Sequence, residues 1–256
     1  MPDNIVDINS KIVGAFRIKN EERWIRMSLE AASSVCDEIV ILDDDSTDDT
    51  VKICKEFEKV VDIHHQSNLP FDESRDKNSL LQMALKRNPD FIMILDGDQV
   101  LQPDAKKILL EDIHIIYPDA EIFEFQLLDI WDKPNQYRYD GSSSNIWIKK
   151  LIRMSKQPKN LYFSTTKYPG NAHCPSIPQN STGLQNSVRS RMKIFHYGKY
   201  DAKLRQQKYD FYTKLDPNNA DFDNYVHVNS GKGRFSGPKG IEVKLIPDKI
   251  FYPDIQ

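Results

Sequence analysis

Two acidic clusters, each directly after an unbroken apolar run, constrain the fold of this chain more than any other feature. Residues 43–50, DDDSTDDT, follow the apolar run 39–42, and residues 96–98, DGD, follow the apolar run 91–95. Such runs without polar alternation are typical of strands buried on both faces, as in parallel sheets. Carboxylates that follow these strands lie at the carboxyl-end edge of the sheet, where open α/β folds bind ligands. The arrangement suits a divalent cation and a nucleotide diphosphate.

The apolar pattern of the first half predicts strands that alternate with helices. Strands are expected at 12–16, 39–42, 60–63 and 91–95, and helices near 21–32, 50–57, 71–87 and 105–116. Asn20 is expected to cap the first helix, and residues 46–49 have the pattern of a capping box before the second. Alternation at this spacing predicts an α/β fold with a doubly wound parallel sheet.

The apolar pattern and the composition of the sequence change after Pro118. Strands are expected at 122–128, 146–152 and 192–197, and a helix from its cap at Asp201 to residue 215. Residues 155–190 are rich in Pro, Ser, Asn and Gly, which predicts a long loop of the kind that often carries function. The tail from residue 229 has several glycines and is expected to add little to the core.

Charge and cysteine content exclude some classes of protein. A net charge of −3 over 256 residues argues against a nucleic-acid partner. The three cysteines, Cys36, Cys54 and Cys174, have no metal-binding spacing and indicate a reducing compartment. No N-terminal stretch resembles a signal peptide, and no apolar run approaches the roughly 18 residues of a membrane span. We expect a cytoplasmic protein without a transmembrane segment, with peripheral membrane contact left open.

Over residues 12–110 the chain resembles the family 2 glycosyltransferases, which have the GT-A fold. That family has a first strand, a turn that contains Asn-Glu, a helix, a strand ending in DDGSTDGT and a later strand ending in Asp-x-Asp. This chain has Asn20-Glu21, then residues 43–50, then residues 96–98, in the same order.

The chain departs from the family pattern at Asp45 and Asp49, where glycine is usual. Aspartate tolerates a left-handed backbone better than most residues, so we expect the turn to keep its shape. The resemblance implies a GT-A-type doubly wound, mixed and mostly parallel sheet. Residues 1–117 would form the nucleotide-sugar-binding half, and residues 118–256 the acceptor-binding half and C-terminal extension of the same domain.

The resemblance also implies roles for residues of the first half. Asp98 would be a direct ligand of Mn²⁺ or Mg²⁺, Asp96 would contact the ribose or the water shell of the metal, and Asp44 would accept a hydrogen bond from the nucleobase. Five further residues are expected to contact the donor: Phe16, Arg17 and Glu21 after the first strand, and Arg75 and Lys77 near the diphosphate. The alternative for each is a structural one, as part of a capping turn, a loop or a helix start.

The second half contains the candidates for the base and for the rest of the metal shell. An inverting transferase needs a carboxylate that takes the proton of the acceptor hydroxyl. Asp132 and Asp140 are the candidates for this base, with Asp129 behind them. His196 ends a predicted strand, and some GT-A enzymes complete the metal shell with a C-terminal histidine, which suits Mn²⁺ more than Mg²⁺. His173 is a candidate for the acceptor cleft; a structural role is the alternative for both histidines.

The helix expected after His196 is rich in basic residues. A basic face attracts phosphate-rich or lipid-surface ligands, but Asp201, Asp210 and Asp216 dilute this one. We therefore interpret these basic residues as a solvated surface: Lys199, Lys203, Arg205, Lys208 and Lys214.

Taken with the residues, the resemblance implies an inverting, metal-dependent glycosyltransferase. The donor would be a nucleotide diphosphate sugar and the acceptor a glycan or lipid-linked hydroxyl, with Mn²⁺ or Mg²⁺ neutralising charge on the leaving group. Two alternatives stay open. One is a nucleotide-sugar-binding scaffold that has lost its base. The other is a nucleotidyltransferase, which usually needs a glycine-rich phosphate loop after the first strand, whereas residues 16–21 contain no glycine.

Overall fold

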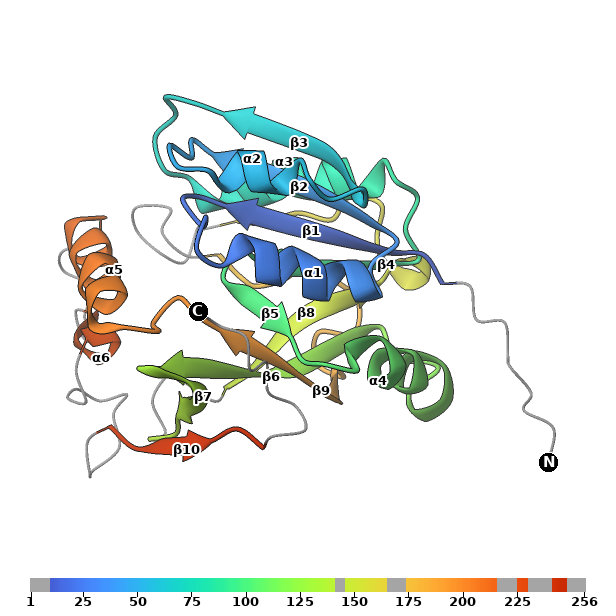
Figure 1. Ribbon diagram of the computed structural model, residues 1–256. Helices are drawn as coiled ribbons and strands as arrows, with labels where there is room; N and C mark the ends of the chain where they lie inside the picture. Colours follow the sequence, from blue (N-terminus) through green and yellow to red (C-terminus); the bar gives the residue numbers. More distant parts are fainter. Residues whose placement is uncertain (1–9, 141–145, 165–173, 216–224, 230–240, 248–256) are drawn as a thin grey trace.

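The computed structural model of the chain describes residues 10–140, 146–164, 174–215, 225–229 and 241–247. These residues form a mixed sheet with helices packed against it (Figure 1). Its strands are β1 (Ile12–Ile18), β2 (Glu38–Asp44), β3 (Val60–Gln66), β4 (Phe91–Asp96), β5 (Gln99–Leu101), β6 (Ile122–Trp131), β7 (Lys133–Arg138), β8 (Ile146–Arg153), β9 (Val188–His196) and β10 (Val243–Leu245).

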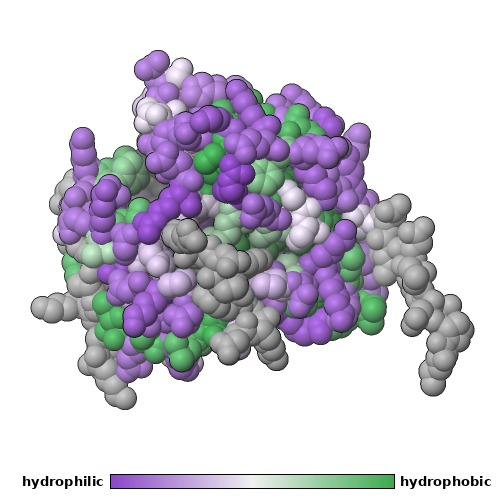
Figure 2. All heavy atoms as spheres, viewed as in Figure 1, coloured by the Kyte–Doolittle hydropathy of each residue, from purple (hydrophilic) through white to green (hydrophobic). Residues whose placement is uncertain are grey.

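The helices are α1 (Ile25–Val35), α2 (Thr50–Cys54), α3 (Glu73–Leu85), α4 (Ala105–Glu111), α5 (Ala202–Leu215) and α6 (Val226–Asn229), with a π-helical turn at Asp112–Ile116 and a 3-10 turn at Met154–Lys156. Helices α1 to α4 alternate with the strands of the first half, and α5 and α6 follow β9. No helix in the described part of the chain is long and apolar enough to cross a membrane. Hydrophilic residues cover most of the face seen in Figure 2.

The first half is a doubly wound parallel sheet, as the sequence predicts. β1 pairs in parallel with β2 and β4, and β2 pairs in parallel with β3. Ile39 and Ile41 of β2 belong to the apolar cluster that contains α1, whereas Val40 and Leu42 belong to the cluster that contains α3. Successive side chains of a strand point to opposite faces, so a strand covered on both faces needs an apolar residue at every position.

The second half makes the sheet mixed, which confirms the predicted fold class. β8 pairs antiparallel with both β4 and β6, while β6 pairs in parallel with β9. β5 pairs antiparallel with β9. The sheet continues from β6 to β7 and ends at β10. β5, β7 and β10 were not expected from the sequence, and β10 lies in the tail that was expected to add little to the core. The division at residue 117 stays a prediction.

Two helix starts differ from their predicted capping. α1 begins at Ile25, and Asn20 has a φ of 53°, so it cannot be the N-cap residue. Its side-chain oxygen instead accepts a hydrogen bond from the backbone N–H of Thr47 at 2.8 Å. α2 begins at Thr50. The backbone N–H of Thr50 donates to Asp48 at 3.0 Å, and this bond replaces the predicted capping box. The loops after β1 and β2 are therefore bound to each other. Asp45 adopts the expected left-handed backbone, with φ 63°.

Candidate active site

A cleft of about 770 Å³ lies at the carboxyl-end edge of the parallel strands. Arg17 at the end of β1, Asp44 at the end of β2 and Asp96 at the end of β4 line one wall. Apolar and aromatic side chains of α5 and of residues 225–229 line the opposite wall: Leu204, Phe211, Tyr212, Tyr225 and Val228. The volume falls within the roughly 300–1,000 Å³ typical of small-molecule sites. Both halves of the chain therefore contribute to one cleft.

Asp98 lies between the side chains of Lys208 and His196 in this cleft. Its Oδ2 atom is 3.3 Å from Nε2 of His196 and 3.0 Å from Nζ of Lys208. The pairing of β5 with β9 creates this contact, because Gln99 is opposite His196 and the backbone N–H of Tyr197 donates to the carbonyl of Asp98. Burial alone would raise the pKa of the Asp98 carboxyl, but the charges of Lys208 and His196 hold it well below its usual range.

A second carboxylate fixes His196 from the other side. Asp129 of β6 is opposite His196 in the parallel pair of β6 and β9, and its Oδ1 atom is 2.5 Å from Nδ1 of the imidazole. Its Oδ2 atom accepts a hydrogen bond from Lys199 at 2.9 Å. Burial lowers the pKa of an imidazole, yet the charges of Asp98 and Asp129 raise that of His196 to about 9. Nε2 of His196 is thereby held toward Asp98.

The donor set around Asp98 fits a divalent cation that is shared with a ligand. A metal-bound histidine commonly donates its other N–H to a carboxylate, as His196 does to Asp129. Oδ1 of Asp98 is buried and has no hydrogen-bond partner among the described residues. No group of three or more His, Cys, Asp or Glu side chains that could hold a metal occurs in the described ranges. Asp98 and His196 would hold the ion, and phosphate and water oxygens would complete its shell.

Gly198 keeps the space around this pair open. A Cβ atom at this position would meet the side-chain polar atoms of Lys208, Asp98 and His196. Glycine is therefore required here for close approach of the backbone to three functional groups.

A network of buried charges holds the end of the cleft next to β2. Arg17 donates to Asp44 at 2.9 Å and to Asp76 at 2.8 and 3.0 Å. Gln66 donates to both carboxylates at 2.9 Å, and Arg75 donates to Asp76 at 2.7 and 3.0 Å. Asp76 is fully buried and organises the network, whereas Asp44 and Arg17 line the cleft. Sequence reasoning did not single out Asp76.

Removal of the Asp76 carboxylate is expected to destabilise the fold. In Asp76→Ala the largely buried Arg17 loses its main partner, and breaking a buried ion pair from one side costs about 3–5 kcal/mol. The free energy of unfolding from urea titrations measures this loss. Asp49→Ala is the control, because its surface pair with Lys52 is worth at most about 1 kcal/mol. Equal midpoints for the two variants would contradict a structural role of the network.

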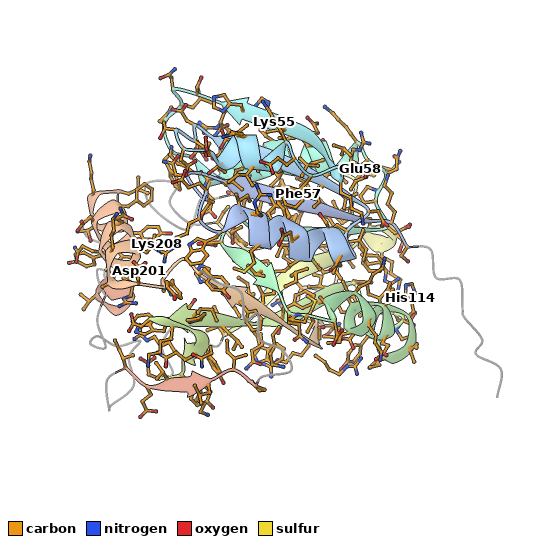
Figure 3. All side chains as sticks on the ribbon, in the orientation of Figure 1. Lys55, Phe57, Glu58, His114, Asp201 and Lys208 are labelled. Atoms are coloured by element: carbon orange, nitrogen blue, oxygen red, sulfur yellow. The ribbon has the colours of Figure 1, made fainter. Side chains whose placement is uncertain are left out.

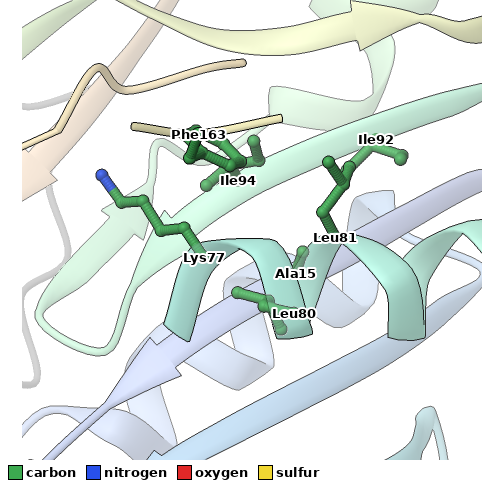
Figure 4. A pocket seen from close by; sticks show the side chains of 7 residues that line it. All are labelled: Ala15, Lys77, Leu80, Leu81, Ile92, Ile94 and Phe163. Atoms are coloured by element: carbon green, nitrogen blue, oxygen red, sulfur yellow. The ribbon is translucent and has the colours of Figure 1, made fainter. Parts of the chain in front are cut away.

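Three of the expected donor contacts lie outside the cleft. Phe16 is fully buried in the hydrophobic core, because its side chain points into the sheet face that packs on α1. Arg75 is held by Asp76 and by the carbonyl of Pro70. Lys77 donates to Glu73 at 2.7 Å, and its stem lies beside a small pocket lined otherwise by apolar side chains (Figure 4). None of the three lines the large cleft.

The other four expected donor residues do line the cleft: Arg17 and Asp44, described above, and Asp96 and Glu21. Asp96 accepts hydrogen bonds from Lys150 at 3.0 Å and from Gln99 at 2.6 Å, and its side chain is 45% exposed. Glu21 packs against the turn at Gly97, where a Cβ would collide with it. Burial and the charge of Asp98 raise the pKa of Glu21 to about 9.

The two carboxylates expected to act as the base are elsewhere. Asp132 lies in the turn between β6 and β7 and pairs with Arg205 at 2.8 Å. Asp140 is buried and pairs with Arg138 at 2.6 Å. Neither lines the cleft, so this placement argues against both as proton acceptors. Asp129, two residues before the end of β6, does line it. His173 lies outside the described residues.

Two lysines of the supposed solvated surface belong to the site. Lys199 and Lys208 both line the cleft and bind Asp129 and Asp98. The sequence gives one indication for Lys199: it follows His196-Tyr197-Gly198 directly, and His196 is a candidate site residue. For Lys208 the sequence holds no such signal, since it is 110 residues from Asp98.

A cleft lined by acidic and basic side chains at the carboxyl-end edge of a doubly wound sheet is typical of ligand-binding α/β proteins. Within that class, residues 18–173, more than half of the chain, match the family described as Glycosyl transferase family 2. The chain belongs to this family. A search of curated proteins found no match.

Solved structures of glycosyltransferases resemble the chain only distantly. TarS 1–349 from S. aureus has 15% identity and a TM-score of 0.48, with 85% of this chain and 70% of that chain covered. The TarS complex with UDP has 15% identity and a TM-score of 0.47, with coverage of 84% and 69%. Glucosyl-3-phosphoglycerate synthase from Mycobacterium tuberculosis, in complex with Mn²⁺, UDP and glucosyl-3-phosphoglycerate, has 18% identity and a TM-score of 0.32, with coverage of 48% and 44%. Similarity at this level carries no information about the substrate of this chain.

Proposed function

We propose that this chain transfers a glycosyl group from a nucleotide diphosphate sugar to a glycan or lipid-linked hydroxyl acceptor, with Mn²⁺ or Mg²⁺ and with inversion at the anomeric carbon. The observation that carries the proposal is the convergence of Asp98 and His196 in a cleft built by both halves of a family 2 chain. A reducing, cytoplasmic location is part of the proposal, supported by three free cysteines.

The proposed donor lies along the wall formed by β1, β2 and β4. Asp44, held by Arg17 and Gln66, presents fixed polar groups to the nucleobase and ribose. Asp98 and His196 would hold the metal next to the diphosphate, where the ion would neutralise charge on the leaving group. The apolar wall of α5 faces this donor site and excludes water from the transferred sugar.

The proposed proton acceptor is a carboxylate of the cleft, since Asp132 and Asp140 lie outside it. Glu21, Glu73 and Asp96 line the cleft next to the donor wall. Glu73 is already bound by Lys77, and Asp96 by Lys150. Replacement of each by its amide, with transfer measured at constant donor binding, separates the base from residues that position the donor. Loss of a general base costs about 10²–10⁴-fold in rate.

A thermal-shift screen tests the donor class. The melting temperature is measured with UDP, GDP, CDP and dTDP and their common sugar derivatives, each with MnCl₂ and with EDTA. A ligand that binds only the folded protein raises its stability, so one nucleotide should raise the melting temperature and should do so mainly with Mn²⁺. No shift with any nucleotide would contradict the proposal. Donor binding without hydrolysis or transfer would favour a nucleotide-sugar-binding scaffold.

Asp129→Asn is expected to weaken metal binding while leaving the cleft in place. The amide cannot hold the imidazole of His196 as the carboxylate does, and loss of such a partner costs about 10–100-fold in metal affinity. The measurement is the Mn²⁺ concentration needed for half of the nucleotide-dependent thermal shift. Asp49→Asn is the control and should behave as the wild type, because its carboxylate pairs with Lys52 on the surface and lies outside the cleft. An unchanged Mn²⁺ requirement in Asp129→Asn would remove His196 from the metal site.

A further inference from the structure

We propose that Lys208 is an exchangeable counter-ion: its ammonium group neutralises Asp98 while the donor is absent and passes to a donor phosphate when the divalent cation takes Asp98. The proposal rests on the proposed function, because it assumes a nucleotide diphosphate as the ligand that arrives with the metal. It predicts that binding of the metal and binding of the nucleotide favour each other.

Lys208 and His196 contact the same carboxylate oxygen of Asp98. A single carboxylate oxygen, Oδ2, is 3.0 Å from the ammonium of Lys208 and 3.3 Å from the imidazole of His196. The carboxylate is only 5% exposed, so water screens these charges weakly. A divalent cation that approaches Asp98 is repelled by the ammonium group of Lys208. Since His196 would itself hold the ion, Lys208 has to leave before the ion binds.

Lys208 is the group that can leave. His196 is fixed from behind by Asp129, and its position in β9 is set by pairing on both sides of that strand. Lys208 instead carries its charge on a flexible four-carbon stem. Its side chain is 31% exposed and lines the cleft, so an ammonium group that turns away from Asp98 stays within the volume where the diphosphate would bind.

The helix that carries Lys208 is attached mainly by its ends. Arg205 is the one buried residue of α5, and it pairs with Asp132. Asp201, just before the helix, pairs with Arg23, and Phe211 packs edge-on against Phe71 across the cleft. Figure 3 shows Lys208 and Asp201 at this end of the molecule. Lys208 itself lies on a part of α5 that is not buried in the core.

The charges explain why metal and nucleotide should bind together. A metal that enters alone leaves the Lys208 ammonium without a partner in a poorly screened site. A nucleotide diphosphate supplies negative charge for both the metal and Lys208. Binding of one ligand should thus favour the other, and such a coupling typically spans about 5–150-fold in affinity.

Calorimetry on the whole chain tests the exchange with Lys208→Gln. MnCl₂ is titrated alone, and UDP, or the diphosphate identified by the screen, is titrated at saturating MnCl₂. The variant should bind Mn²⁺ alone more tightly than the wild type and bind the nucleotide more weakly, each within the span of about 5–150-fold. Lys203→Gln removes the same charge from an exposed position of the same helix and should change neither affinity.

Lys208→Gln should strengthen Mn²⁺ binding and weaken nucleotide binding. These opposite effects distinguish an exchangeable counter-ion from a structural residue. If Lys208→Gln binds Mn²⁺ alone no more tightly than the wild type, the proposal is wrong. If the wild type binds Mn²⁺ but no nucleotide diphosphate, the proposed function fails, while the Mn²⁺ titrations still report whether Lys208 competes for Asp98.

Acetylation of the wild type gives a second test that needs no variant. Mass spectrometry follows the labelling of Lys208 by acetic anhydride. Mn²⁺ alone should raise the labelling, because the ion displaces the amine from Asp98, and added nucleotide should lower it again. Labelling that does not respond to saturating Mn²⁺ would overturn the proposal even if Lys208→Gln fails to fold.

Discussion

Asp98→Asn is expected to abolish the metal-dependent rise in stability that a nucleotide diphosphate gives the wild type. An amide keeps the shape of the side chain but has no charge to hold a divalent cation between His196 and the donor phosphates. A ligand at 100 times its dissociation constant stabilises the folded state by about 2.7 kcal/mol, and this whole increment should disappear. The measurement is the melting temperature with nucleotide in MnCl₂ and in EDTA.

The asparagine variant is preferable to alanine because Asp98 is buried between the side chains of Lys208 and His196. Alanine would leave Lys208 and His196 facing each other without an anion, and loss of stability would obscure loss of binding. Asp49→Asn is the control, since this carboxylate lies on the surface beside Lys52. A wild-type metal-dependent shift in Asp98→Asn would show that the metal is held elsewhere.

Gly198→Ala is expected to disrupt the same site by sterics alone. The added methyl group would overlap the polar atoms of Lys208, Asp98 and His196, and these have to move apart to admit it. Overpacking of this kind costs about 1–3 kcal/mol, and here the displaced groups are those that would bind metal and phosphate. Metal-dependent nucleotide binding, measured by calorimetry, should fall far more than the melting temperature does.

Gly14→Ala is the matched control for this substitution. Gly14 lies within β1, where a Cβ would meet Cys36 at 3.0 Å and Ile39 at 3.3 Å in the core behind the cleft. It should lower the melting temperature and leave nucleotide affinity unchanged. Similar losses of nucleotide affinity in both variants would mean that Gly198 acts through general stability.

The strands of the first half could be predicted because burial on both faces requires a continuous run of apolar residues in the sequence. The runs 39–42 and 91–95 became the centres of β2 and β4. β5 and β10 have three residues each, which is too short for a recognisable apolar run. They are strands because they pair with β9 and β7, respectively. The start of α1 was wrong for a related reason: Asn20 suits a cap by residue type, but it binds the neighbouring loop instead.

The candidate site could be predicted where it follows directly from strand ends. Asp44, Asp96 and Asp98 were placed at one edge of the sheet by this rule, and all three line the cleft. The rule does not apply to the second half, where the site depends on the register between β6 and β9. That register faces Asp129 toward His196, whereas Asp132, three residues later, lies beyond the end of β6.

The pairing of β5 with β9 also fixes when the site can form during synthesis. The parallel strands β1 to β4 can pair as soon as they leave the ribosome, because their partners are already made. β5 has an unpaired edge until β9 has been synthesised, and Lys208 is synthesised after β9. A nascent chain that ends before residue 196 contains the acidic turn at 96–98 but no histidine for Asp98 to face. Asp98 is thus synthesised 110 residues before Lys208, its partner in the site.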